Sequence, residues 1–334
     1  MSKRKLTDQQ RRRIQANQKK RRQKVHGNNA DGDTNLGPEQ VGRIITRFGK
    51  SAIVQASDQT YRCGIRQHLN DLVCGDEVTW QMAESGDGII VAINPRRNTL
   101  TRPDFAHKLK PVAANIDTIW IVATVFPLFD STLIDQYTIA AEFSQIPPAI
   151  IFNKIDLLSE DALAKLQKSL SVYQDIGYQV LYASNTTHHG IDIITHELID
   201  KTSVFVGQSG VGKSSLLNSI HPELELATKQ VSEQTGLGTH TTSRTTLYHL
   251  PSGGELIDSP GVREFGLWHL DVSELAQYFV EFRPLLGQCK FSDCTHIHEP
   301  DCTIRQAVAD GKISQQRYDN YTLIRERILE NPNR

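Results

Sequence analysis

Between about residues 40 and 100, short runs of β-type residues alternate with turns that contain Gly, Asn or Asp. The runs are Val41–Phe48, Ser51–Ala56, Thr60–Arg66, Glu77–Gln81 and Gly88–Ile93. Five short strands in about 60 residues are typical of a small barrel, and the OB-fold is the leading candidate. The exposed face of such a barrel commonly binds RNA or DNA, whereas the alternative is a purely structural all-β module.

From about residue 112 to 268 the apolar pattern alternates between strand and helix. Strands are predicted at Thr118–Val125, Pro148–Asn153, Gln179–Ala183 and Ser203–Val206, and helices at Thr132–Phe143, Leu163–Tyr173, Ile191–Leu198 and Lys213–Ile220. This alternation predicts a parallel sheet covered by helices, with ligands at the carboxyl ends of the strands. Residues 271–331 follow a helical pattern that a Cys/His cluster interrupts.

The patterns divide the chain into four segments and predict a multidomain protein. We expect a basic arm and linker at 1–38, an all-β OB barrel at 39–102, an α/β domain at 103–270 and a helical metal-binding domain at 271–334. We find no internal repeats.

Charge is distributed unevenly along the chain. Residues 1–26 hold eleven Lys and Arg against one acid, so this tail carries +10 and leaves −11 on the rest of a chain whose net charge is −1. A basic tail on an acidic body indicates an arm that contacts nucleic acid, although a solvated extension without a partner is the alternative. The tail has almost no apolar residues, so any helix there should form only on binding.

Location follows from what the sequence lacks. No apolar run approaches the roughly 20 residues that a membrane span needs, and the basic N-terminus has no apolar core of a secretory signal. Five cysteines, an odd number, argue against a secreted disulfide framework. We therefore expect a cytoplasmic protein without membrane contact, and nothing indicates an obligate dimer, so we expect a monomer.

A phosphate-binding loop is predicted between a strand and a helix. The segment fits G-x-x-x-x-G-K-[ST] and comprises Gly207, Gln208, Ser209, Gly210, Val211, Gly212, Lys213 and Ser214, with Ser215 following. Its glycines let the backbone wrap an anion, and the start of the following helix adds partial positive charge. Lys213 is expected to contact the terminal phosphates and to act in catalysis, while the Ser214 hydroxyl holds Mg²⁺.

Two further segments suit the γ-phosphate and its metal. Asp258 follows a β-type run and precedes Gly261, so its carboxylate is expected to bind Mg²⁺ through water and the Gly261 N–H to sense the γ-phosphate. Between the two loops lies a hydroxyl-rich stretch around 236–244 that has the character of a nucleotide-sensing switch. Thr242 is the expected second Mg²⁺ ligand, with Thr241 as the alternative.

Guanine recognition is indicated by Asn153, Lys154, Ile155 and Asp156, which form an NKxD box after an apolar strand. The Asp156 carboxylate can accept hydrogen bonds from the two donors that guanine offers and adenine lacks. The Lys154 stem packs along the base, and Asn153 ties the two loops together. A second loop on the side of the base is expected at Ala183 and Ser184.

The position that normally orients the attacking water carries an aliphatic side chain. In Ras-like enzymes a Gln follows the DxxG glycine, whereas here that residue is Val262. Intrinsic hydrolysis should therefore be slow unless another side chain or a partner places the water. His249, on the strand before Asp258, is a candidate catalytic imidazole, and the alternative is a packed or surface histidine.

The cluster Cys289-x₄-Cys294-x-His296-x₅-Cys302 offers three thiolates and one imidazole within fourteen residues. This set matches a closed, structural Cys₃His zinc site with one ion per chain. His298 is a possible substitute for His296, and reduced cysteines without a metal are the alternative. Cys63 and Cys74 in the predicted barrel are expected to be packing residues.

The order of the motifs is rotated relative to an ordinary Ras-like GTPase, because the NKxD box precedes the phosphate loop. Together with the basic arm, the barrel, Gly238–Thr242, the Asp258–Arg263 segment and the Cys₃His spacing, this order resembles the RsgA (YjeQ) family of circularly permuted bacterial GTPases. The resemblance covers nearly the whole chain. It departs at Ala183-Ser184, where the family more often has Ser first.

The resemblance implies a GTPase that binds the small ribosomal subunit and its rRNA and acts in late maturation of that subunit. It also implies that the subunit stimulates hydrolysis of GTP to GDP, which is slow in the protein alone. Val262 keeps a second function open, an rRNA-binding module whose GTP pocket is regulatory and barely hydrolytic. A third, a GTPase acting on a protein partner in traffic or signalling, is disfavoured by the basic arm and the barrel.

Overall fold

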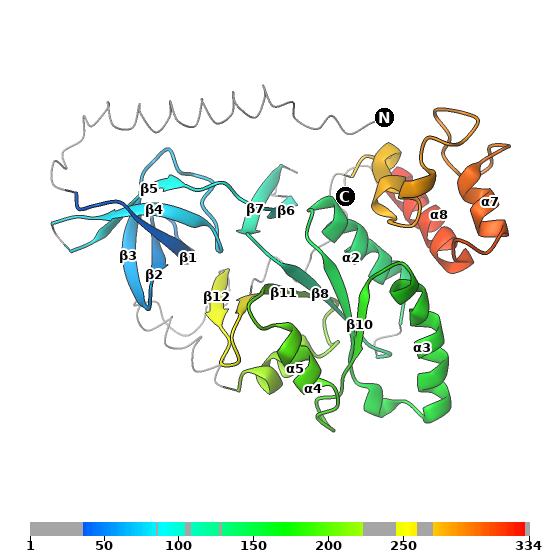
Figure 1. Cartoon of the computed structure of the whole chain (residues 1–334), viewed down its shortest axis with the longest axis horizontal. Helices are drawn as coiled ribbons and strands as arrows, with labels where there is room; N and C mark the ends of the chain where they lie inside the picture. Colours follow the sequence, from blue (N-terminus) through cyan, green and yellow to red (C-terminus); the bar gives the residue numbers. More distant parts are fainter. Residues whose placement is uncertain are drawn as a thin grey trace.

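The computed structural model describes residues 36–84, 86–103, 108–126, 129–222, 245–258 and 270–330. Three parts follow one another in the chain and lie side by side, with the barrel and the C-terminal helices on either side of the central sheet (Figure 1). The predicted fold class is confirmed in each part.

The barrel contains β1 (Gln40–Phe48), β2 (Ser51–Ala56), β3 (Gln59–Ile65), β4 (Glu77–Met82) and β5 (Gly88–Ile93). They run in the order β1-β2-β3-β5-β4, and pairing of β4 with β1 closes the ring. Alternate residues point inward and form a core around Trp80, Leu72 and Ile90, all with no exposed surface. Cys63 belongs to this core and Cys74 to that of the central domain, so both are packing residues, as expected.

A hairpin that the sequence pattern did not indicate follows the barrel. β6 (Thr99–Pro103) pairs antiparallel with β7 (Leu109–Ala114). The expected domain boundary between residues 102 and 103 therefore falls inside this hairpin. Pro103 and Pro111 interrupt the apolar alternation, and for this reason the two strands leave a weak signal in the sequence.

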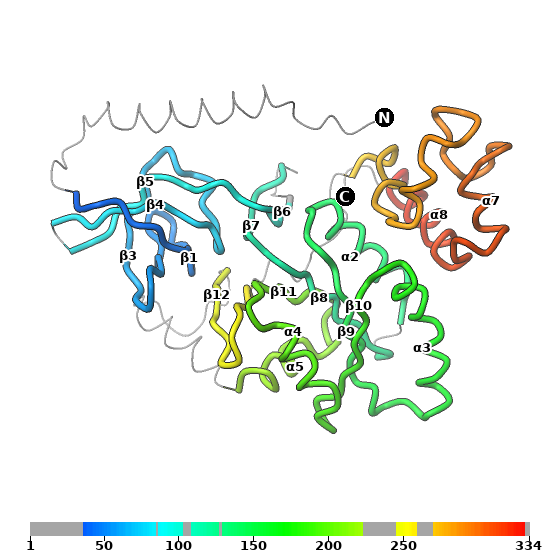
Figure 2. The backbone as a smooth tube through the Cα atoms, viewed as in Figure 1, coloured from blue at the N-terminus to red at the C-terminus, as the bar shows by residue number. Residues whose placement is uncertain are grey.

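The central sheet has the strand order β10-β9-β8-β11-β13-β12. Its strands are β8 (Thr118–Ala123), β9 (Pro148–Phe152), β10 (Gln179–Tyr182), β11 (Thr202–Val206), β12 (Thr246–His249) and β13 (Glu255–Asp258). All pairs are parallel except β12 with β13. β11 lies between β8 and β13 although almost 80 residues separate it from β8, as the tube in Figure 2 shows.

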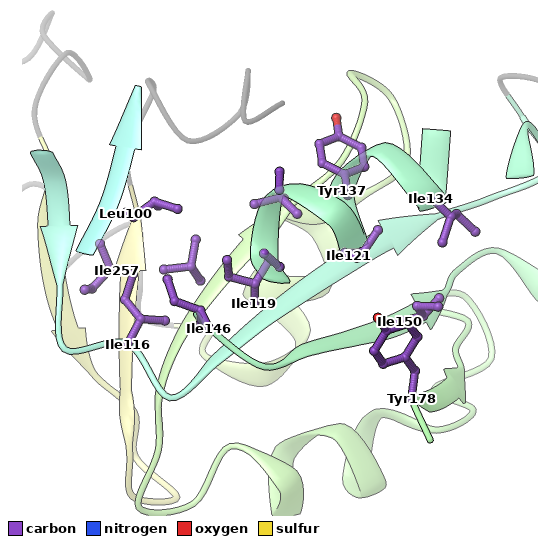
Figure 3. Packing of buried hydrophobic residues seen from close by; sticks show 14 of the residues in the cluster. Leu100, Ile116, Ile119, Ile121, Ile134, Tyr137, Ile146, Ile150, Tyr178 and Ile257 are labelled. Atoms are coloured by element: carbon purple, nitrogen blue, oxygen red, sulfur yellow. The ribbon is translucent and has the colours of Figure 1, made fainter. Parts of the chain in front are cut away.

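Helices cover both faces of this sheet. α2 (Ser131–Phe143) and α3 (Glu160–Asp175) pack on one face, and α4 (Ile191–Glu197) and α5 (Lys213–Ile220) pack on the other. Figure 3 shows Ile134 and Tyr137 of α2 close to Ile121 of β8. Side chains of Asp130 and Ser159 cap the first turns of α2 and α3 by accepting backbone N–H bonds, which fixes where these helices begin.

The C-terminal part is helical, as predicted. It contains η2 (Val272–Tyr278), η3 (Arg283–Leu285), α7 (Thr303–Ala309) and α8 (Gln315–Glu330). The short η1 (Ile155–Leu157) belongs to the central domain, after β9. The apolar core of the C-terminal part includes Ile139 of α2, so α2 is buried against both the sheet and the C-terminal part. Within the described ranges, no helix is both long enough and apolar enough to span a bilayer.

Candidate functional site

The predicted phosphate loop joins the end of β11 to the start of α5. Gly207 has a φ of +140°, and a Cβ there would lie 2.3 Å from the Val122 carbonyl oxygen. Gly212 has a φ of +93°, and its Cβ would lie 2.5 Å from the Asn153 Nδ2 atom. A side chain fits at neither position, so the two glycines are needed for the loop to pass this close to β8 and to the NKxD box.

The loop presents its backbone to solvent at the carboxyl edge of the sheet. Gln208, Ser209 and Gly210 are exposed, whereas Val211 is buried and anchors the loop in the apolar core beneath it. The Lys213 ammonium donates to the carbonyl oxygens of Gly207 and Gln208, at 2.7 and 2.6 Å. The positive charge of Lys213 therefore lies across the mouth of the loop, where an anion would bind.

Ser214 and Ser215 are both exposed in the first turn of α5, beside the loop. An exposed hydroxyl at this point can reach a metal ion held by the phosphates of a nucleotide. The position of Ser214 therefore fits the Mg²⁺ role that the motif predicts.

The NKxD box is bonded directly to the phosphate loop. Asn153 is fully buried, and its Nδ2 donates to the Val211 carbonyl at 3.0 Å. Lys154 adopts a φ of +63°, and its ammonium donates to the Gly210 carbonyl at 2.6 Å. Asp156 is exposed beside them. An exposed carboxylate thus lies next to a lysine whose stem crosses to the phosphate loop, as a site that reads a base would require.

The second loop on the side of the base lies against the box. The Ile155 N–H donates to the Ala183 carbonyl at 3.2 Å, and both Ala183 and Ser184 have no exposed surface. The Ser184 hydroxyl accepts a bond from the Thr187 N–H at 3.1 Å, within its own turn. Because this hydroxyl is engaged in shaping the loop, any contact of this loop with a base would come from its backbone.

Asp258 ends β13 on the same edge of the sheet as the phosphate loop. β13 pairs in parallel with β11, and Ile257 is in register with Val204, two residues before the end of β11. The Asp258 carboxylate therefore lies at the end of the strand adjacent to the one that carries the loop. Gly261, Thr242 and its alternative Thr241, and Val262 lie outside the described residues.

His249 does not lie beside the phosphate loop. It is in register with Glu255, and Glu255 is in register with Thr202, the first residue of β11, whereas the loop begins after Val206. Its Nε2 bonds the Gln55 side chain of the barrel, and its Nδ1 lies 3.8 Å from Glu255. The expected catalytic position is therefore not supported, because β12 runs antiparallel and carries His249 to the amino edge of the sheet. These contacts and its half-exposed side chain fit the alternative, a packed or surface histidine.

The four predicted metal ligands converge. The ligand atoms of Cys289, Cys294, His296 and Cys302 all lie within 4.8 Å of one another. A tetrahedral zinc ion places two sulfurs about 3.8 Å apart and a sulfur and nitrogen about 3.6 Å apart. The Cys289 and Cys302 sulfurs are 3.9 Å apart, and each lies 3.5 Å from the His296 Nδ1 atom. The group could therefore hold a metal ion, whereas His298 is exposed and lies outside it.

The loop between these ligands is shaped by Glu299, which the sequence pattern did not single out. Its carboxylate accepts bonds from the hydroxyl and N–H of Thr295 and from the N–H groups of Ile297 and His298. Burial acts to raise the pKa of Glu299, but these bonds hold it well below the usual range. Burial also lowers the pKa of His296, which favours the neutral imidazole that binds metals.

Comparisons with known proteins agree with this geometry. Residues 93–268 match the family model described as RsgA GTPase. The "Small ribosomal subunit biogenesis GTPase RsgA 1" of Vibrio vulnificus is 48% identical over 98% of this chain and 95% of its own. The "Small ribosomal subunit biogenesis GTPase RsgA" of Haemophilus influenzae is 45% identical over 99% of this chain and 97% of its own.

Two solved structures are similar over most of the chain. YjeQ from Thermotoga maritima superimposes with a TM-score of 0.74 and 32% identity, covering 87% of this chain and 99% of its own. YloQ, described as a circularly permuted GTPase, superimposes with a TM-score of 0.72 and 31% identity, covering 91% and 100%. The rotated order of the motifs is therefore a property of the fold that these proteins share with this chain.

Proposed function

This chain belongs to the RsgA GTPase family, and we propose that it hydrolyses GTP while bound to the small ribosomal subunit, during late maturation of that particle. The names of its relatives support the partner, because proteins 45–48% identical over almost the full length are described as small ribosomal subunit biogenesis GTPases. The products are GDP and phosphate.

The observation that carries the proposal is the pair of bonds between base box and phosphate loop. Asn153 bonds Val211 and Lys154 bonds Gly210, so the two halves of a guanine nucleotide site are joined although the chain visits them in reverse order. We assign the phosphates to the loop from Gly207 to Ser215, with Gly261, and the base to Asn153–Asp156, with the Ala183-Ser184 backbone.

Lys213 and a magnesium ion would share the charge of the terminal phosphates. We assign the ion to Ser214, Asp258 and Thr242, all oxygen donors of the kind that Mg²⁺ prefers. Such an ion neutralises charge that develops during phosphoryl transfer. The Lys213 ammonium, already across the mouth of the loop, adds a fixed positive charge beside it.

Hydrolysis requires a group that orients the attacking water, and Val262 cannot supply one because its side chain is aliphatic. We therefore assign this role to the assembled complex with the subunit. A partner that completes a GTPase site can accelerate turnover by about 10³–10⁵-fold. The protein would then be slow in isolation and fast on its target.

We assign a single structural zinc ion to Cys289, Cys294, His296 and Cys302. The distances between the sulfurs and the imidazole nitrogen support this choice, and four protein ligands leave no position for a reactive water. The ion would fix the C-terminal domain. The barrel and the basic arm supply surfaces suited to rRNA, with the arm contributing eleven positive residues.

The decisive experiment measures GTP hydrolysis by the purified protein alone, with small subunits and with large subunits as the control. We expect strong stimulation by small subunits and none by large ones. Tight GTP binding without stimulation would contradict the proposal and favour an rRNA-binding module with a regulatory pocket. Binding to the subunit that weakens steeply as salt rises would indicate contact with rRNA. This result would distinguish the proposed GTPase and the rRNA-binding module from a GTPase that acts on a protein partner in traffic.

The site assignment has its own test in Asp156→Asn. An Asn amide can donate to the second oxygen of xanthine but cannot accept both guanine donors, so preference should move from GTP to xanthosine triphosphate. We expect GTP affinity to fall by at least about a hundredfold. Unchanged preference would show that Asp156 does not read the base.

A further inference from the structure

The C-terminal domain meets the central domain at a buried arginine. Arg317 of α8 has no exposed surface, and neither does Asp135 of α2. The Arg317 guanidinium binds the Asp135 carboxylate through Nη1 and binds Glu281 through Nε and Nη2, at 2.7 and 3.1 Å. One cation therefore joins two carboxylates that come from different domains.

Aromatic rings enclose this cation. The guanidinium carbon lies 4.5 Å from the centre of the Phe279 ring and 5.5 Å from that of Tyr173 in α3. Arginine above an aromatic face is attracted by the ring, and the attraction is stronger where water is excluded. The Tyr173 hydroxyl also donates to Asp135 at 2.7 Å. Residues from both domains thus contact the arginine.

A second α8 residue, Asn320, is hydrogen-bonded to the first turns of α2. The Asn320 Nδ2 donates to the Asp135 carboxylate at 2.7 Å and to the Ser131 hydroxyl at 3.1 Å. The Thr132 hydroxyl donates back to the Asn320 carbonyl oxygen at 3.1 Å. The amide of Asn320 is therefore bonded through both its nitrogen and its oxygen to the start of one helix.

The segment just before α2 is bonded to the base box. Four residues before the helix cap Asp130, the Phe126 carbonyl accepts a bond from the Lys154 ammonium at 3.4 Å. Before that, the Ala123 carbonyl accepts from the Asn153 N–H at 2.8 Å. A short piece of chain thus separates the helix turn that Asn320 holds from the two carbonyls that bond Asn153 and Lys154.

A buried ion cluster favours the geometry in which every charge has its partner. Removing charges from water costs several kcal/mol per ion and is offset only when every partner is in place. A tilt of the C-terminal domain on α2 would leave Asp135 or Glu281 charged, buried and unpaired. Any other orientation of the domain on α2 would therefore break this cluster.

We propose that Arg317 and Asn320 are positioning residues that lock the C-terminal domain onto α2, and that stimulation by the small subunit reaches the nucleotide site through this joint. The second half rests on the proposed function. The competing route is the chain itself, because the C-terminal domain follows the Asp258 segment directly in sequence. If stimulation travels through the joint, breaking the joint should abolish it even though the connecting chain is intact. If it travels along the chain, breaking the joint should leave it unchanged.

The test variant carries Asp135→Asn, Glu281→Gln and Arg317→Met together. Removing all three charges avoids an unpaired buried carboxylate, so the protein should still fold. Asn320→Ala is the second, milder variant. The matched control is Arg283→Met, which removes an exposed ion pair with Glu142 between the same C-terminal domain and α2.

The first measurement is a distance distribution between spectroscopic labels at Lys168 on α3 and Glu326 on α8, both exposed. We expect one narrow distance in the native protein and in the control, and a broad distribution in the triple variant. A narrow, unchanged distance in the triple variant would show that the cluster does not set the orientation.

The second measurement is GTP turnover with and without small subunits, together with metal content. In the triple variant we expect one metal ion per chain, unstimulated turnover within twofold of native, and stimulated kcat reduced at least tenfold with little change in KM for GTP. Stimulation equal to native despite a broad distance distribution would overturn transmission through the joint. If native protein is not stimulated, the proposed function fails and transmission with it, while the label distances still decide the lock.

Discussion

The central domain has two neighbours, and it is joined to them in different ways. The barrel is attached through backbone pairing, since Thr46 of β1 is in register with Thr246 of β12 and Cys74 forms a bridge with Ala113. The ion pair of Arg43 with Glu255 across this junction is partly exposed, at 24% and 18% of the side-chain surfaces. The C-terminal domain is attached by side chains instead, around an arginine that water does not reach.

This difference has a physical consequence for how each junction responds to change. A strand pairing with half-exposed polar groups can lose one contact and regain water in its place, so its strength is spread over many small terms. The dry ionic junction has no water to take over a lost partner, so its strength depends on each member. A single substitution should therefore lower the stability of the barrel junction only slightly. A single substitution in the ion cluster should disrupt the C-terminal junction.

Removal of the proposed zinc ion should distinguish the two junctions most strongly. Structural zinc contributes on the order of 10 kcal/mol to the folding of small domains, and Cys302 is part of the same apolar core as Phe279 and Tyr321. We expect a strong chelator, or Cys302→Ser, to unfold the C-terminal domain and release α8 from α2. Hydrogen exchange should then rise throughout residues 270–330.

The same experiment contains its control in the barrel. Strands β1 to β5 hold no predicted metal ligand, so their exchange rates should stay as they are in the untreated protein. A uniform rise over the whole chain would mean that the two junctions are not independent.

Arg317→Met alone should have the next largest effect. The substitution leaves Asp135 and Glu281 buried without their cation, which costs about 3–5 kcal/mol. We expect the C-terminal domain to unfold at markedly lower denaturant concentration. A loss below about 1 kcal/mol would imply that water enters the cluster and that the junction is not dry.

Arg43→Met should weaken the barrel junction by less, about 1–2 kcal/mol. Arg43 bonds the Thr202 hydroxyl at 2.8 Å as well as Glu255 at 2.7 Å, but both carboxylate and guanidinium touch solvent. Denaturant unfolding, followed by the fluorescence of Trp80 in the barrel core, would measure this loss of stability. A cost as large as that of Arg317→Met would remove the contrast between the two junctions.

His249→Ala should produce the smallest change. The side chain is half exposed and contacts Gln55 and Glu255 at the amino edge of the sheet. We expect less than about 1 kcal/mol of stability to be lost and turnover, with or without small subunits, to stay within twofold of native. Loss of turnover with unchanged nucleotide affinity would return His249 to the catalytic machinery.

Most of the helices and strands could be predicted from the sequence because short-range residue patterns determine them. The predicted runs Ser51–Ala56, Gly88–Ile93 and Lys213–Ile220 coincide with β2, β5 and α5. The base box and phosphate loop were identifiable because glycine conformation and carboxylate chemistry allow few substitutes, and the structure brings them into contact. The cysteine spacing similarly brought four ligand atoms together.

What the sequence missed depends on contacts between distant segments. His249 precedes Asp258 by nine residues, but only the antiparallel turn of β12 onto β13 decides which edge of the sheet it faces. Arg317 and Asp135 lie 182 residues apart, and a lone arginine in an amphipathic helix normally points to water. No local pattern distinguishes such a residue from a surface one.

The position of β11 in the middle of the sheet has a consequence for synthesis on the ribosome. The chain makes the guanine-reading segment first, and Ser214 follows Asp156 by 58 residues. At roughly 5–20 residues per second, about 3–12 s pass between the synthesis of Asp156 and that of Ser214. Until β11 is made, the edge of β8 that β11 later covers has no partner strand, and the phosphate loop that follows β11 cannot yet contribute to a nucleotide site. Rare codons or pauses placed between β10 and β11 should therefore lower the yield of native protein more than pauses placed after α5.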